Sequence, residues 1–167
     1  MYLKLLHESD CASLLDFESE NRKWFEQFIP PREGGFYCFE GVRSHVLDFL
    51  SDYRQRQCLP MLVCGTEGEV IGRVNLHSLC METASAYLGY RIGEQYTRRG
   101  VASFAVNEIL QQARRIGLKK IVAFAATDNI ASQKVLANNQ FLKGECVKNY
   151  ARLNGKAIHC YKYTLQL

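Results

Sequence analysis

Residues 87–106, YLGYRIGEQYTRRGVASFAV, constrain the fold of this chain more than any other segment. An extended apolar pattern leads into a short loop with two arginines and Gly100, and helical spacing of apolar residues begins at Val101. The first turn of a helix has unpaired N–H groups and a partial positive charge, so it can bind a phosphate group. Gly100 allows the backbone to approach a ligand closely. The segment predicts either a phosphate-binding loop or a turn in which the glycine is purely structural.

The composition indicates one soluble domain over residues 1–167. Hydrophobic residues make up 47% of the chain and charged residues 23%, which excludes a disordered or fibrous protein. No apolar run approaches the roughly 20 residues that cross a bilayer, and the N-terminal segment lacks signal-peptide features. We therefore expect a cytoplasmic protein with no membrane partner. The cysteines have no metal-ligand spacing, so neither a disulfide framework nor a metal site is expected.

The first part of the chain is predicted to contain one strand followed by helices. The strand covers 2–6, and a helix opens at Ser9 or Asp10. A second helical stretch around Trp24 ends at Pro30. After a loop, a long amphipathic helix begins at Phe39.

The rest of the chain is predicted to contain most of the strands. Apolar and alternating patterns predict strands at 59–64, 70–79, 84–92, 121–126, 141–150 and 157–165, with helices at 101–116 and from Asp128 or Asn129. In the 70–79 strand, Arg73, Asn75 and His77 share one face, which is therefore polar. The predicted fold is α+β, with a mixed, mostly antiparallel sheet flanked by helices in the order β-α-α-β-β-β-α-β-α-β-β.

These motifs together resemble the GCN5-related N-acetyltransferase (GNAT) superfamily, and within it the Rim-type enzymes that acetylate the α-amino group of ribosomal proteins. The family signature Q/R-x-x-G-x-G/A is similar to residues 97–102, with Thr97 at its first position. Further similarities lie at 21–25, 88–93, 129–132 and 153–155. The resemblance implies the GNAT sheet, N-acetyltransferase activity and acetyl-CoA as the co-substrate.

The resemblance also implies a set of cofactor-binding residues. Amides of the loop and first helical turn would hold the pyrophosphate of acetyl-CoA: Arg98, Arg99, Gly100, Val101, Ala102 and Ser103. The backbone of Tyr90, Arg91 and Ile92 would pair with the pantetheine arm like an added strand. Asn129 would bind the arm from the other side, with Ser132 near the sulfur.

Catalysis requires a donor for the oxyanion and an acid for the departing thiolate. Ser132 is the predicted acid by the same resemblance, and a hydrogen bond to backbone in the first helical turn is its structural alternative. A backbone N–H of Tyr90 or Arg91 is the predicted oxyanion donor. The general base stays open, because relatives can have a glutamate where this chain has Ala151. The remaining candidates for the base are Glu82, Glu94, Glu145 and His77.

The missing carboxylate favours an acceptor that is already partly neutral. At pH 7 about a tenth of an α-amine is neutral, against well under a thousandth of a lysine amine. The predicted acceptor is therefore the N-terminal α-amine of a protein or peptide, with Asn21, Trp24, Asn75 and His77 as predicted contacts.

Two other functions remain as alternatives. One is acetylation of a small-molecule amine, such as a polyamine, an amino acid or a drug. The other is a noncatalytic CoA-binding or nucleic-acid-associated module. The formal charge of +4 is too small to predict direct nucleic-acid binding.

Overall fold

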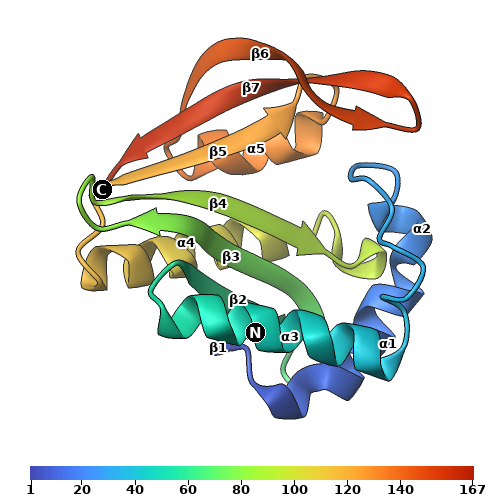
Figure 1. Cartoon of the computed structure of the whole chain (residues 1–167). Coiled ribbons are helices and arrows are strands. Elements are labelled where there is room, and N and C mark those ends of the chain that lie inside the picture. The colour runs from blue at the N-terminus through green and yellow to red at the C-terminus, as the bar shows by residue number, and fades with distance from the viewer.

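The sheet consists of two groups of antiparallel strands joined by one parallel pair. In the computed structural model, which describes residues 1–167, seven strands follow the order β1-β2-β3-β4-β5-β7-β6. Every neighbouring pair is antiparallel except β4 and β5. The predicted α+β fold with a mixed, mostly antiparallel sheet is confirmed, and helices flank the sheet (Figure 1).

The elements occur close to where the sequence periodicity places them. The strands are β1 (Tyr2–Leu5), β2 (Cys58–Cys64), β3 (Val70–Cys80), β4 (Ser85–Ile92), β5 (Lys120–Ala126), β6 (Leu142–Leu153) and β7 (Lys156–Gln166). The helices are α1 (Cys11–Glu20), α2 (Arg22–Phe25), α3 (Phe39–Arg54), α4 (Val101–Arg115) and α5 (Ile130–Asn138), with short 3-10 turns η1 (Glu8–Asp10) and η2 (Glu94–Tyr96). None of these helices combines the length and the apolar character that a membrane crossing requires.

Three helices lie between β1 and β2, where the expected order has two. Asn21 separates α1 from α2 because its backbone, at φ −97° and ψ 8°, departs from the α-helical conformation. Residues 30–33, which include two prolines, have no regular secondary structure, since proline disfavours helix in the residue before it. The helical stretches predicted from Ser9 or Asp10 and around Trp24 are thus two distinct helices, α1 and α2, and the predicted element order is one helix short.

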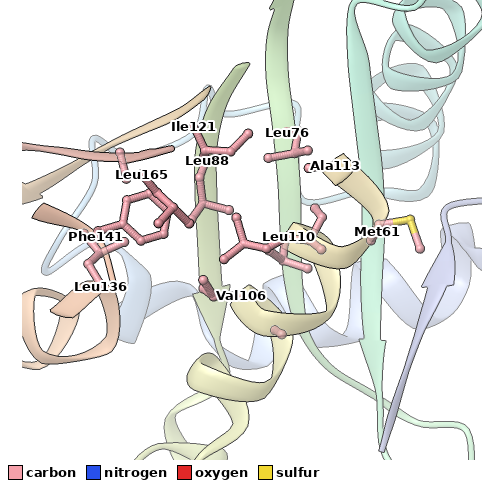
Figure 2. Packing of buried hydrophobic residues seen from close by; sticks show 14 of the residues in the cluster. Met61, Leu76, Leu88, Val106, Leu110, Ala113, Ile121, Leu136, Phe141 and Leu165 are labelled. Atoms are coloured by element: carbon pink, nitrogen blue, oxygen red, sulfur yellow. The ribbon is translucent and has the colours of Figure 1, made fainter. Parts of the chain in front are cut away.

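Alternation along β2 separates two hydrophobic cores on opposite faces of the sheet. Met61 and Val63 belong to a core of 22 buried residues that includes the inner face of α4. Figure 2 shows Val106 and Leu110 of α4 in this core, near Leu88 of β4. Leu62 and Cys64 instead join a core of nine buried residues with α1 and α3. The helices on each face thus hold the central strands in fixed positions.

The parallel pair β4–β5 ends half-way along β4. Its last residues in register are Leu88 and Ala123. Beyond this point β4 stays paired with β3 as far as Ile92, and β5 stays paired with β7 as far as Ala126. The two strands separate toward their C-terminal ends (Figure 1). We call this region, β4 residues 89–92 opposite β5 residues 124–126, the divergence.

Candidate active site

Two residues of β4 turn their backbone groups toward the divergence. The N–H of Gly93 donates to the carbonyl of Ile71 on β3, with an N to O distance of 3.0 Å. Backbone groups of successive strand residues face opposite edges, so Tyr90 and Ile92 face the divergence and Arg91 faces β3. Of the two predicted oxyanion donors, only the N–H of Tyr90 is therefore directed to the divergence.

The side chain of Tyr90 joins β4 to α5 across the divergence. Its hydroxyl lies 2.9 Å from Ser132 Oγ and 3.3 Å from the Ser132 carbonyl oxygen. Asn129 holds the start of α5, because its Oδ1 accepts a hydrogen bond of 3.0 Å from the N–H of Ser132. Burial raises the pKa of Tyr90 to about 12, so the phenol is neutral at physiological pH. The structure thus places two hydroxyl groups in contact beside the free edge of β4.

The loop before α4 contains two left-handed residues and leaves the start of that helix without a side-chain cap. Gly100 is the N-cap of α4 in the left-handed region, with φ 77°, and no side chain caps the helix there. Arg98 is also left-handed, with φ 58°, which is uncommon for a residue with a side chain. Arg98, Arg99 and Gly100 are exposed, whereas Ala102 and Ser103 are half-buried and Val101 is buried. The first N–H groups of a 15-residue helix are therefore left for a ligand.

Trp24 and Asn21, which were predicted to contact the acceptor, form hydrogen bonds with backbone groups at the end of β4 and the start of the loop. The indole N–H of Trp24 donates to the carbonyl oxygen of Ile92 at 3.2 Å. Buried Asn21 accepts a hydrogen bond of 2.8 Å from the N–H of Glu94 and donates to the carbonyl of Phe17 at 2.9 Å. These bonds fix α1 and α2 against the end of β4. Direct contact of Asn21 or Trp24 with an acceptor stays a prediction.

A buried group of charges lies on the α1–α3 face of the sheet. Glu18 is fully buried and pairs with Arg73 at 2.6 Å and with Arg91 at 3.1 Å. Burial alone would raise the pKa of Glu18, but the guanidiniums of Arg91 and Arg73 outweigh it and hold that pKa below its usual value. Arg73 also donates to Nε2 of His45, over a distance of 3.1 Å. Burial and the guanidiniums of Arg73 and Arg32 lower the pKa of His45 to about 3, so this imidazole is neutral.

The same face of the sheet is open in the middle of β4. A side chain added at Gly89 would meet no atom within 4 Å, and Gly89 is in register with Asn75 of β3. Next to this open space, an aromatic row crosses four strands. The ring centroids of His77, Tyr87, Phe124 and Tyr150 follow one another at 5.7, 6.2 and 4.5 Å. A molecule lying over Gly89 would thus reach the divergence between an aromatic wall and the buried charges.

The chain matches a known protein family. A family model described as "Acetyltransferase (GNAT) domain" matches residues 1–141. The chain belongs to the GNAT acetyltransferase family. It is an N-acetyltransferase, and the family resemblance predicted from the motifs is confirmed.

Similar proteins include a ribosomal-protein acetyltransferase. The chain is 25% identical over 158 residues to "Probable N-acetyltransferase YjcK" of Bacillus subtilis (strain 168), covering 93% of this chain and 87% of that protein. It is 24% identical over 160 residues to "[Ribosomal protein uS5]-alanine N-acetyltransferase" of Escherichia coli (strain K12), covering 93% of this chain and 82% of the relative.

Two solved structures share the fold. The ribosomal-protein-S5-alanine acetyltransferase of Vibrio fischeri superposes with a TM-score of 0.93 at 23% identity, over 98% of this chain and 91% of that one. The microcin C7 self-immunity acetyltransferase MccE, in complex with acetyl-CoA and AMP, superposes with a TM-score of 0.91 at 17% identity. The superposition covers 99% of this chain and 91% of that one. Membership in the GNAT family implies acetyl-CoA as the co-substrate of this chain.

The residues around the divergence fit acetyl-CoA. The uncapped start of α4 offers N–H groups to a pyrophosphate, and left-handed Gly100 has open space where a side chain would stand. At the edge of β4, Tyr90 offers both backbone groups to an extended arm, whereas the carbonyl of Ile92 already accepts from Trp24. When bound, the co-substrate supplies the acetyl group as a thioester. Placement of the pyrophosphate and of the arm on these residues stays a prediction.

None of the candidate bases contacts the Tyr90–Ser132 pair. Glu82 lies in the turn at the far end of the β3–β4 hairpin, and Glu145 is exposed on the outer strand β6. Glu94 starts η2, where its backbone is bound by Asn21. His77 lies 3.2 Å from the Ser78 hydroxyl through Nδ1, and desolvation lowers its pKa. No group of three or more His, Cys, Asp or Glu side chains is placed to hold a metal ion.

The sequence interpretation missed the buried charges. Arg73 lies on the predicted polar face of β3, opposite Val74, but α1 and α3 cover that face, so the guanidinium is buried and paired. Glu18 falls on the same side of α1 as buried Cys11 and Leu14, which was a readable signal of a carboxylate aimed at the core. His45 carries a similar signal, since it lies three residues after buried Val42 and four before Phe49 on α3. Arg32 carries none, because its role depends on how the loop before α3 packs.

Proposed function

We propose that residues 1–167 form one N-acetyltransferase domain that acetylates the N-terminal α-amine of a protein or peptide. The observation that carries this proposal is a site with hydroxyl groups and a free strand edge but no carboxylate in contact with them. Such a site suits an amine that is already partly neutral at pH 7, which describes an α-amine better than a lysine. The name of the similar uS5-alanine acetyltransferase of E. coli supports the same acceptor class.

In this proposal, Tyr90 and Ser132 share the work at the thioester. The backbone N–H of Tyr90 stabilises the carbonyl oxygen as it becomes negative. The amine nitrogen bonds to the carbonyl carbon, the carbon–sulfur bond breaks, and the sulfur takes the proton of the Ser132 hydroxyl. The phenol of Tyr90, 2.9 Å from Ser132 Oγ, passes its proton to that oxygen. The proton lost by the amine goes to water, and water reprotonates Tyr90, so charge and protons balance.

A peptide with a free N-terminus and one internal lysine tests the proposal. Incubation with acetyl-CoA and fragmentation by mass spectrometry should locate the acetyl group on the N-terminal nitrogen. The matched control is the same peptide with its N-terminus already blocked, which should not react. Acetyl groups found chiefly on lysine in either peptide would contradict the proposal.

A small-molecule amine is the second candidate acceptor. A cavity opens on the α1–α3 face of the sheet, which we call the acceptor face. Its volume of about 650 Å³ is within the usual size range of small-ligand sites. The fold-level likeness to MccE, whose structure holds acetyl-CoA and AMP, agrees with this alternative. A panel of polyamines and amino acids in the same transfer assay separates the two: small amines that react faster than every peptide would favour it.

A further inference from the structure

The cavity on the acceptor face lies between the loop before α3 and the end of β4. Polar side chains from three segments line it: Arg32 and Glu33 from the loop, His45 and Asp48 from α3, and Arg91 from β4. Phe36 and Ile29 supply apolar wall. Arg91 is two residues beyond Gly89 on the same face of β4, so their Cα atoms are roughly 7 Å apart along the strand. The cavity is thus adjacent to the open space through which an acceptor would reach the divergence.

The inner part of this region carries more positive than negative charge. Three guanidiniums, those of Arg32, Arg73 and Arg91, surround a single buried carboxylate, Glu18. His45 adds no charge, and because its Nε2 accepts from Arg73, its Nδ1 carries the proton and is a hydrogen-bond donor. Two acidic residues, Glu33 and Asp48, also line the cavity, but both are exposed to solvent. Solvent screens exposed charges far more than buried ones.

Arg32 is the group that the fold leaves unsatisfied. Its Nε is shielded from solvent and has no hydrogen-bond partner. The guanidinium carbon lies 4.6 Å from the centroid of the Phe36 ring, so stacking holds the side chain in place. A buried N–H without a partner costs free energy, and Arg32 shares the single buried carboxylate, Glu18, with two other guanidiniums. A carboxylate bound at Arg32 would offset this cost, because it accepts from a guanidinium through two parallel hydrogen bonds.

We propose that this cavity binds a carboxylate group of the acceptor through Arg32 and Arg91. The inference rests on the proposed function, since it names which N-termini the enzyme selects. An amine over Gly89 and a carboxylate at Arg91 are separated by about two residues of extended chain. The preferred acceptor is therefore a peptide with Asp or Glu at its second or third position. A free amino acid could supply the same carboxylate, and the test below distinguishes that acceptor from a peptide.

The test compares peptides that differ only in charge. One peptide carries Glu at its second and third positions, and its isostere carries Gln at both. The parent enzyme should acetylate the Glu peptide with a kcat/KM at least about tenfold higher, mainly through a lower KM. Equal values for the two peptides would overturn the inference and leave the proposed function standing. Failure to acetylate the N-terminus of either peptide would count against both.

Arg32→Gln is the variant that probes the cavity itself. The preference for Glu over Gln should fall to within about threefold, because the KM of the Glu peptide rises toward that of the Gln peptide. Arg22→Gln is the matched control, because Arg22 also stacks on an aromatic ring of this region, 4.5 Å from the Tyr37 centroid, but does not line the cavity. The control should keep the full preference. An Arg32→Gln enzyme that binds CoA normally and keeps the tenfold preference would contradict the role of Arg32.

Free glutamate, tested as an acceptor alongside the peptides, identifies the source of the carboxylate. Peptides should exceed it in kcat/KM. A free amino acid that outperforms the peptides, and loses its advantage in Arg32→Gln, would keep the carboxylate site and overturn the assignment to a peptide.

Discussion

The loop at 97–100 and the cavity beside Arg91 lie on the donor and acceptor sides of the active site and are built from different parts of the chain. The donor side uses backbone groups: the free N–H groups of α4 after left-handed Gly100 and the unpaired edge of β4. The acceptor side uses side chains from α1, α3, β3 and β4, held together by Glu18. Backbone donors suit a co-substrate that is the same for the whole family. Side chains can change without altering the fold, so the acceptor side is where specificity can differ.

The largest effect is expected on the donor side, from Gly100→Pro. Proline removes one N–H and fixes φ near −65°, whereas Gly100 has φ 77°. Calorimetry should find no measurable CoA binding to this variant. Arg98→Ala, the control, removes an exposed side chain and leaves the amides, so its affinity should fall only a few-fold. Retained CoA affinity in a folded Gly100→Pro protein, checked by circular dichroism, would show that binding does not depend on this loop.

The next largest effect is expected on kcat, from changes to the hydroxyl groups of Tyr90 and Ser132, which lie between the donor and acceptor sides. Ser132→Ala should lower kcat by about 10² to 10⁴ and leave CoA affinity nearly unchanged, as expected for a general acid. Tyr90→Phe keeps the backbone N–H and the ring, so its kcat should fall less than that of Ser132→Ala. The measurement is steady-state kinetics with thiol release. A Ser132→Ala enzyme with most of its kcat would return Ser132 to a structural role.

The smallest effect is expected on stability, from Glu18→Gln. Removing the carboxylate leaves Arg73 and Arg91 buried without their counter-ion, and such losses cost about 3 kcal/mol. Urea unfolding measures this change. Glu8→Gln, which breaks the exposed pair with Arg43, is the control and should cost less than about 1 kcal/mol. A Glu18→Gln loss no larger than that of the control would mean that the buried charges are not coupled.

The pH dependence of that loss has a defined sign. In the folded state the pKa of Glu18 lies below its ordinary value of 4.5, so the unfolded chain takes up the proton first as pH falls. The contribution of Glu18 to stability is therefore complete above about pH 4.5 and is lost as pH decreases through the lower, folded-state value. Parent and Glu18→Gln should converge in stability in that acidic range.

The sequence predicts features that depend on local patterns, but not contacts between residues that are far apart in the chain. The helix start at Gly100, the helix opening at Asn129 and the apolar strand β5 follow from local patterns of a few residues. The buried pair of Glu18 and Arg73 spans 55 residues, and Glu18 and Arg91 are 73 residues apart. Their contact depends on how α1 packs across β3 and β4, which no local pattern encodes. Tyr90 and Ser132 were each singled out from the sequence, but their contact across 42 residues appears only in the fold.

The acceptor preference of a site without a strong base is tested most directly by a pH profile. kcat/KM is measured from pH 6 to 9 for a peptide whose only amine is its N-terminus and for a peptide whose only amine is a lysine. For the first peptide the rate should rise tenfold per pH unit and level off near pH 8, as the neutral fraction of an α-amine does. The lysine peptide should react far more slowly at pH 7. A flat profile, or faster acetylation of the lysine peptide, would contradict acetylation of an α-amine by this enzyme.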